Sequence, residues 1–282
     1  MSRQKWLLIK LILLILIFII LGRISICVIS SSTLKNTHFG GITMGNTPSI
    51  QGDKKSFSNI EKIVVDSISL PVHIYESDVT QVTVQDNSKV YILGTKSPNK
   101  LSQEDDVLSF KQGKQFSFLS ITRGNIVIEV PRGSALEYDI NNISGSIIHD
   151  AMSRDTLTAT SISGSVKILQ PGEKLFAKST SGSVRIYSPF EDVSAKSISG
   201  SVQILANQDS KQISGSSVSG SVKIQLENVS GYTMDYSTTS GSVKDTYANI
   251  DYSKSGKTSY GDSSLKINAS SISGSIKLTN WE

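Results

Sequence analysis

The side chains that could carry catalytic or metal chemistry are few and widely separated in this chain of 282 residues. Three histidines occur, His38, His73 and His149, and their spacing is unlike that of zinc ligands. The sequence has no phosphate-binding glycine loop and no dinucleotide-binding fingerprint. A stretch that resembles a nucleophile turn, residues 214–220, lies inside a repeat. We therefore predict no catalytic residue, no metal site and no cofactor.

Adjacent acidic groups are a second candidate for chemistry, because glycoside hydrolases use two carboxylates that flank the scissile bond. Such groups occur at Glu104-Asp105-Asp106 and at Glu191-Asp192, and Asp150 follows His149. Acidic residues that are neighbours in sequence are more typical of solvated turns. A carbohydrate-active β-helix enzyme is therefore our third functional hypothesis, after two non-enzymatic ones.

Serine hydroxyls are the most regularly spaced reactive groups, and they occur in a phrase, Ser-Gly-Ser followed by Val or Ile, that returns seven times. Its glycines are Gly145, Gly164, Gly182, Gly200, Gly220, Gly241 and Gly274. The steps between them are 19, 18, 18, 20, 21 and 33 residues. Self-similarity near 20 residues indicates stacked repeats. We interpret these serines as structural residues.

The residues around each repeat glycine alternate between apolar and polar, which predicts two short strands per repeat. Counted in residues from the glycine, the inward positions are odd before it and even after it. The chain must therefore bend at the glycine so that the side chains of both strands face the interior. Glycine tolerates the dihedral angles of such a bend. The sequence therefore predicts an all-β fold, a right-handed parallel β-solenoid with repeats of 18–21 residues over residues 131–282.

The serines one and three positions before each glycine leave two interpretations open. They either form hydrogen-bonded ladders between coils inside the stack or lie at surface turns. The alternation continues through them without a break, which favours the ladders.

Residues 1–32 predict a cytoplasmic tip and one transmembrane helix. Leu11 to Leu21 is unbroken Leu, Ile and Phe, and apolar residues continue to Ile29, which is long enough to span a bilayer. Positive charges before this stretch favour a cytoplasmic N-terminus. The alternative is a cleaved signal peptide. We expect a single-pass protein of the cell membrane, with residues 33–55 as a linker and an extracellular C-terminal domain.

Residues 56–130 alternate in the same way without the glycine phrase. We expect them to cap the N-terminal end of the stack and to form one continuous domain, residues 56–282, with the repeats.

The long step between Gly241 and Gly274 contains an insertion with Tyr247, Tyr252 and Tyr260 in a polar context. Aromatic rings on such a loop could stack on sugars or on a partner protein, so these tyrosines are candidate partner-binding residues. The alternative is an insertion that the repeat tolerates and that binds nothing.

Charge and cysteine content exclude further classes. Five of the 28 Lys and Arg residues precede residue 36, which leaves 23 basic against 24 acidic residues in the remainder. This balance argues against nucleic-acid binding. The single cysteine, Cys27, lies in the anchor segment, so the external part has no disulfide. The sequence assigns no oligomeric state.

Three stretches resemble a known family: residues 57–66, the link Val127-Ile128-Glu129-Val130-Pro131, and the Ser-Gly-Ser units. They are similar to the bacterial "putative adhesin" family of β-strand-repeat proteins, a domain of unknown function common in Gram-positive bacteria. The resemblance covers about residues 55–280. It implies a right-handed β-solenoid, often behind one membrane segment, and no active-site residues. Some relatives are encoded beside envelope-stress systems.

Our leading hypothesis is therefore a membrane-anchored, non-enzymatic surface module that binds a cell-wall polymer or a surface or envelope protein. The second hypothesis is an accessory regulator of a system that senses cell-envelope stress.

Overall fold

The computed structural model describes residues 54–96, 98–113 and 115–281, and every regular element in these ranges is a β-strand. The all-β prediction is thus confirmed. Among the described residues no helix is long and apolar enough to cross a membrane. The predicted anchor at 1–32 and nearly all of the predicted linker lie outside these residues.

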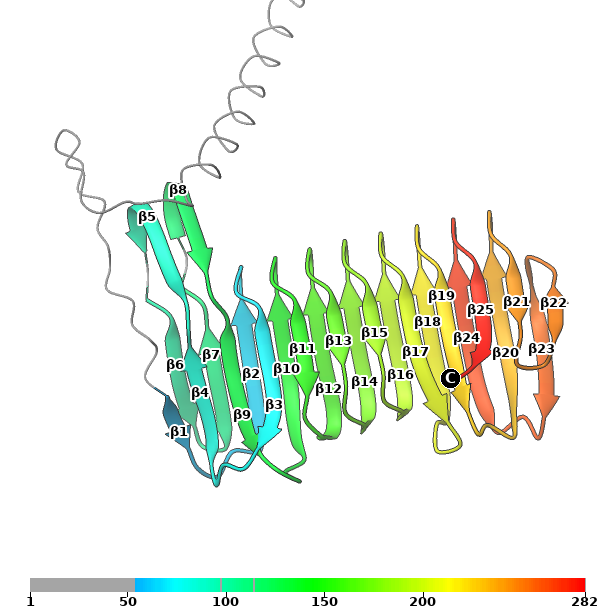
Figure 1. The fold of residues 1–282 in the computed structure, drawn as a ribbon, viewed down its shortest axis with the longest axis horizontal. Helices are drawn as coiled ribbons and strands as arrows, with labels where there is room; N and C mark the ends of the chain where they lie inside the picture. The colour runs from blue at the N-terminus through cyan, green and yellow to red at the C-terminus, as the bar shows by residue number, and fades with distance from the viewer. Residues whose placement is uncertain (1–53, 97, 114, 282) are drawn as a thin grey trace, which may run out of the picture. The chain divides into compact units, whose positions relative to one another are not determined.

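Most strands belong to two sheets, which we name sheet A and sheet B (Figure 1). In spatial order, sheet A contains β1 (Lys55–Phe57), β4 (Val82–Asp86), β9 (Ile126–Pro131), β3 (Val72–Ser77), β11 (Ile147–Asp150), β13 (Val166–Ile168), β15 (Val184–Ile186), β17 (Val202–Asn207), β19 (Val222–Glu227), β25 (Ile276–Asn280), β21 (Val243–Asp245) and β22 (Ile250–Tyr252).

Sheet B lies next to sheet A, and each coil contributes a strand to both sheets. In spatial order it contains β6 (Lys100–Glu104), β7 (Val107–Lys111), β2 (Lys62–Ser67), β10 (Leu136–Asn142), β12 (Ser153–Ser161), β14 (Gly172–Ser179), β16 (Phe190–Ser197), β18 (Gln212–Ser217), β24 (Leu265–Ser271), β20 (Gly231–Thr238) and β23 (Ser255–Gly261). A separate two-stranded antiparallel ribbon pairs β5 (Lys89–Lys96) with β8 (Gln115–Arg123).

Each repeat supplies one strand to sheet B before its glycine and one to sheet A after it. Neighbouring repeats pair in parallel and in register, so Leu157 lies opposite Leu175, which lies opposite Val193. The inward residues alternate with exposed ones, as in the pattern BeBeBeB (buried, exposed) of β24. One continuous hydrophobic core extends from Ile60 to Leu278, and burial of this apolar surface holds the two sheets together.

The order of the coils differs from the order of the repeats. The last repeat, β24 and β25, lies between the coil of β18 and β19 and the coil of β20 and β21. The chain therefore leaves one position empty, continues outward and returns to fill it. Figure 1 shows this as the red strands enclosed between yellow and orange ones. The coils therefore do not stack in sequence order at this point.

Antiparallel strands close both ends of the parallel stack. At one end β22 pairs with β21 and β23 pairs with β20. At the other end β4 pairs with β9 and β6 pairs with β7. The predicted polar insertion after Gly241 is thus not an open loop, because its residues form the antiparallel strands β22 and β23.

The repeat glycines are required by close approach and not by an unusual backbone conformation. In the described residues the glycines with positive φ are Gly124, Gly133 and Gly261, none of which is a repeat glycine. A Cβ atom at Gly200 would lie 2.3 Å from the carbonyl oxygen of Gly182 in the preceding coil. Only glycine lets successive bends pack at this distance. Our expectation that dihedral freedom selects these glycines was wrong.

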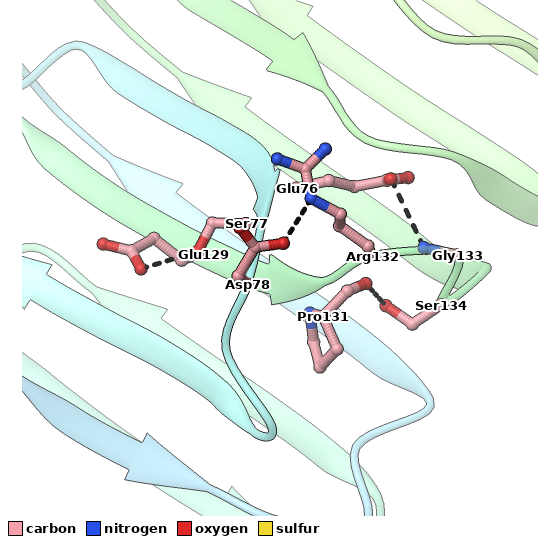
Figure 2. A network of polar contacts seen from close by, with 8 residues as sticks. All are labelled: Glu76, Ser77, Asp78, Glu129, Pro131, Arg132, Gly133 and Ser134. Carbon is pink, nitrogen blue, oxygen red and sulfur yellow. Dashed lines mark hydrogen bonds and ion pairs between the residues drawn. The ribbon is translucent and has the colours of Figure 1, made fainter.

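At the end of the coils away from the repeat glycines, polar contacts connect the loops that follow β3 and β9. Figure 2 shows Arg132 paired with Asp78 at 2.6 Å and the backbone N–H of Gly133 donating to Glu76. Glu129 accepts hydrogen bonds from Ser77 and, at 2.7 Å, from Lys54. Burial alone would raise the pKa of Glu129, but these donors hold it below its usual value.

Candidate binding surface

The bend at each repeat glycine is held by the serine three positions before it. Ser197 Oγ accepts a hydrogen bond from the N–H of Gly200 in its own coil at 2.8 Å and donates to the carbonyl of Gly182 in the preceding coil at 2.9 Å. The same pair of bonds recurs in other repeats, at Ser161, Ser179, Ser217, Thr238 and Ser271. In the first repeat, Asn142 takes this role.

This geometry separates the two sets of serines that the sequence left open. The serines three positions before the glycine are buried and connect coil to coil, so the ladder prediction is confirmed for them. The serines one position before the glycine, such as Ser163 and Ser199, are exposed. They lie on the outside of the bend, which we call the corner.

Large apolar side chains are also exposed at the corner. The residue two positions before the glycine is Ile or Val in five repeats, and its exposure ranges from 38% to 51%. Backbone hydrogen bonds join successive corners, so these residues form one row, with Thr180 inside it and Thr239 at its end. We call this row the apolar ridge; its members are Ile143, Ile162, Ile198, Val218 and Ile272. This exposed apolar row, interrupted by Thr180, is a candidate interaction surface.

A groove of about 510 Å³ lies along the ridge at its N-terminal end. One side is apolar and includes Ile143 and Ile162; the other is polar. On the polar side Thr160 donates to Asn141 Oδ1, and Asn141 donates to Asp66 at 3.5 Å. The groove therefore offers apolar contact next to a row of hydrogen-bonding groups, and it extends across several coils.

The three predicted partner-binding tyrosines lie at the opposite end of the stack. Tyr247 and Tyr252 are partly buried and pack against the core, whereas Tyr260 is 40% exposed and stacks on the buried Tyr232 with ring centroids 5.7 Å apart. Tyr252 donates to the fully buried Asp245.

Asp245 organises this end of the stack. Its Oδ1 accepts from the backbone N–H groups of Tyr247 and Ala248 at 2.9 Å each, and Tyr232 donates to its Oδ2. Burial and the hydrogen bond to Asp245 raise the pKa of Tyr232. The structure therefore gives Tyr247 and Tyr252 packing roles and leaves Tyr260 as the exposed ring.

The other candidate groups are not brought together. Among the described residues no cluster of three His, Cys, Asp or Glu side chains could hold a metal ion. Glu191 pairs with Lys211 at the surface at 2.5 Å. His149 is fully buried against the ring of Tyr138, with 4.4 Å between ring centroids, and neither of its nitrogens has a hydrogen-bond partner. Burial lowers the pKa of His149 to about 3.

Sequence reasoning missed the ridge although its signal was present. The position two before the glycine carries Ile, Ile, Thr, Ile, Val, Thr and Ile in the seven repeats. This position has an even offset, so the alternation itself predicts that it faces outward. An apolar residue at a repeated outward position was the available signal.

The two-sheet stack of parallel coils defines the chain as a β-solenoid-like repeat protein. Residues 60–279 match the Toastrack DUF4097 family, and the chain belongs to this family, a domain of unknown function. The predicted family resemblance is confirmed.

Two solved structures are similar to the chain. One is described as a "putative cell adhesion protein" from Clostridium sporogenes ATCC 15579; it is 13% identical, covers 81% of this chain and 98% of its own, and has a TM-score of 0.34. The other is described as a "putative adhesin" from Bacteroides fragilis NCTC 9343, with 13% identity, 80% and 94% coverage and a TM-score of 0.39. Both scores lie below 0.5, so the family match alone assigns the chain. No curated protein matches the sequence.

Proposed function

We propose that the protein is a non-enzymatic, adhesin-like binding module that a single N-terminal anchor holds on the outer side of the cell membrane. The observation that carries this proposal is the apolar ridge. Five exposed Ile and Val side chains at one repeated position have no packing role inside the stack. Exposed apolar surface lowers solubility, and a row that recurs over successive coils is best explained by a partner that covers it.

The geometry of the apolar ridge suits an elongated partner. Adjacent corners are about 4.8 Å apart, because each corner continues the strand pairing of the sheets. A partner that follows the ridge would contact several coils at once and would also reach the groove between Ile143 and Thr160. A cell-wall polymer and an extended segment of an envelope protein both have this form.

The test is co-sedimentation of a purified fragment with isolated walls of a Gram-positive bacterium. Residues 45–282 form a compact unit by themselves, so this fragment is suitable. We expect the triple substitution Ile143→Ser, Ile162→Ser and Ile198→Ser to lower the bound fraction at least tenfold. The matched control is Met152→Ser, Ile250→Ser and Trp281→Ser, which removes three side chains of similar exposure elsewhere and should leave binding intact.

A bound fraction that both triple variants lower equally would contradict the proposal, as would a native fragment that does not sediment with walls. Circular dichroism of each variant checks that it is folded.

A further inference from the structure

A row of cations runs along the outer face of sheet A, beside the corner. The residue three positions after the repeat glycine points outward, and strand pairing places these residues next to one another coil by coil. In spatial order, the row is Lys167, Arg185, Gln203, Lys223, Lys277 and Lys244; the first repeat has the apolar Ile148 at this position, next to Lys167, and is not counted in the row. Five of its six members are positively charged at neutral pH. We call this row the basic row.

Acidic residues are scarce along the basic row: the one in register with a member is Asp251, opposite Lys244 at the end of the row. Among the described residues, none of the ion pairs involves a member of the row. On sheet B, by contrast, Lys62 pairs with Glu137 at 2.9 Å and Lys211 pairs with Glu191. Two positions further along their strands lie Leu205, Gln225 and Thr279, and the corresponding positions after β13, β15 and β21 lie beyond the strand ends. None of these residues is charged. Sheet B also carries lysines outside these ion pairs, such as Lys178 and Lys196, so what distinguishes sheet A is that five cations share one column of the strand register.

The serines that follow the repeat glycines flank this row on the corner side. Ser165 precedes Lys167 by two positions, and Ser221 precedes Lys223 in the same way, so each hydroxyl lies on the same face as a cation. Ammonium groups with neighbouring hydroxyl donors suit phosphate oxygens. Successive positions of the row are about 4.8 Å apart, and the six positions span roughly 24 Å. Gln203 separates the cations Arg185 and Lys223.

We propose that the basic row binds a linear, flexible polymer with phosphodiester charges, such as a poly(glycerol phosphate) chain, lying along the coils. This inference rests on the proposed envelope-binding function and names its ligand class. A flat membrane surface would be matched by cations spread over an area, whereas here they form a single row. Because the apolar ridge runs beside this row, binding to anionic vesicles is measured as the competing outcome. Single-stranded nucleic acid would be matched by aromatic rings between successive cations. Among the described residues one such contact is present, the ring of Tyr187 with its centroid 5.4 Å from Lys167 Nζ, at one end of the row.

The experiment measures binding of the 45–282 fragment to deacylated poly(glycerol phosphate) at several salt concentrations. We expect the affinity to fall as salt rises, because the contacts are ionic. The double substitution Lys223→Gln and Lys277→Gln should weaken binding roughly tenfold and lower the slope of log K against log salt by about 1.4. The matched control, Lys174→Gln and Lys266→Gln on sheet B, should change neither value.

Three results would overturn the inference: equal effects of the two double variants, binding that ignores salt, or tighter binding to anionic vesicles or to a single-stranded oligonucleotide than to the polymer. The wall assay separates this failure from failure of the proposed function. If walls are bound but the basic-row variant sediments like the native fragment, the function stands and the polymer proposal fails. If the polymer is bound but walls are not, the polymer proposal stands and the proposed wall-binding function fails.

Discussion

At the scale of single residues, the serine hydroxyl inside each corner is the bond that joins one coil to the next. Ser197 satisfies the N–H of Gly200 and the carbonyl of Gly182, which are otherwise enclosed by the bend. Replacing Ser197 by Ala leaves both backbone groups without this partner. We expect Ser197→Ala to lower the free energy of unfolding by about 2 kcal/mol, measured by urea denaturation.

The control for this prediction exists in the protein. Thr238 makes the equivalent two bonds, with the N–H of Gly241 in its own coil and with the carbonyl of Gly274 in the neighbouring coil, so Ser197→Thr should retain most of the stability. A Ser197→Ala variant as stable as the native protein would show that the corner hydroxyls are dispensable.

His149 is the residue whose protonation should limit stability in acid. Its column elsewhere contains apolar residues, such as Ile168 in the next coil and Ile74 in the preceding one. Because the folded pKa, about 3, lies below the unfolded value of 6.5, folding favours the neutral ring. The contribution of His149 to the free energy of unfolding is complete above pH 6.5 and is lost as the pH falls toward 3.

The variant His149→Ile, which installs the residue of the neighbouring coil, should therefore remove part of the acid sensitivity. Between pH 7.5 and pH 5 the native protein should lose about 2 kcal/mol through this group, and the variant should not. Urea denaturation at the two pH values measures the difference. A His73→Gln variant, altered at a half-exposed histidine, should behave like the native protein, and equal acid sensitivity of all three proteins would contradict the assignment.

At the scale of elements, the C-terminal coil holds the end cap in place. Strand β20 contacts the rest of sheet B only through β24, and β21 contacts the rest of sheet A only through β25. A chain that ends at residue 262 lacks both connecting strands. We expect it to lose hydrogen-exchange protection throughout residues 231–261 while β14 and β16 stay protected.

A chain that ends at residue 280 keeps every strand and serves as the control. Unchanged protection of residues 231–261 in the shorter chain would mean that the cap folds without its connecting coil.

The sequence predicts the elements better than their order. Alternation around the glycines correctly predicts two strands per repeat and the inward columns, because a half-buried strand has a period of two. The insertion of β24 and β25 between earlier coils could not be predicted, since repeats of equal length and equal packing surface pair equally well with either neighbour. Likewise, the alternation does not reveal that the carbonyl of Gly182 approaches Gly200, a contact between coils.

The candidate site likewise contains features that the sequence predicts and contacts that it does not. Tyr247 and Tyr252 attract notice as aromatic residues in a polar stretch, but their burial depends on strand β20, with which the sequence gives no sign of contact. The apolar ridge and the basic row are instead visible as fixed offsets from the glycine. They can be recognised as surfaces only once the residues at the same offset in successive repeats are known to be neighbours in space.

At the scale of the whole molecule, the described residues form a stack whose interior is uniform and whose two outer faces differ. Antiparallel strands close the ends, so the parallel coils do not offer free edges for further pairing. The corner, with its exposed serines and the apolar ridge, is the surface that every repeat rebuilds. We therefore propose that binding occurs at the corner and not at the turns at the other end of the coils.

Site-specific photo-crosslinking of the full-length protein in intact cells tests this assignment most directly. A photoreactive residue is placed singly at Ser163, Ser199 or Ser219, all exposed at the corner, or at Gln208, which is exposed in a turn at the other end. We predict crosslinks to a wall or envelope component from the three corner positions and none from Gln208. Equal crosslinking from all four positions, or crosslinking from Gln208 alone, would contradict the claim that the corner is the binding surface.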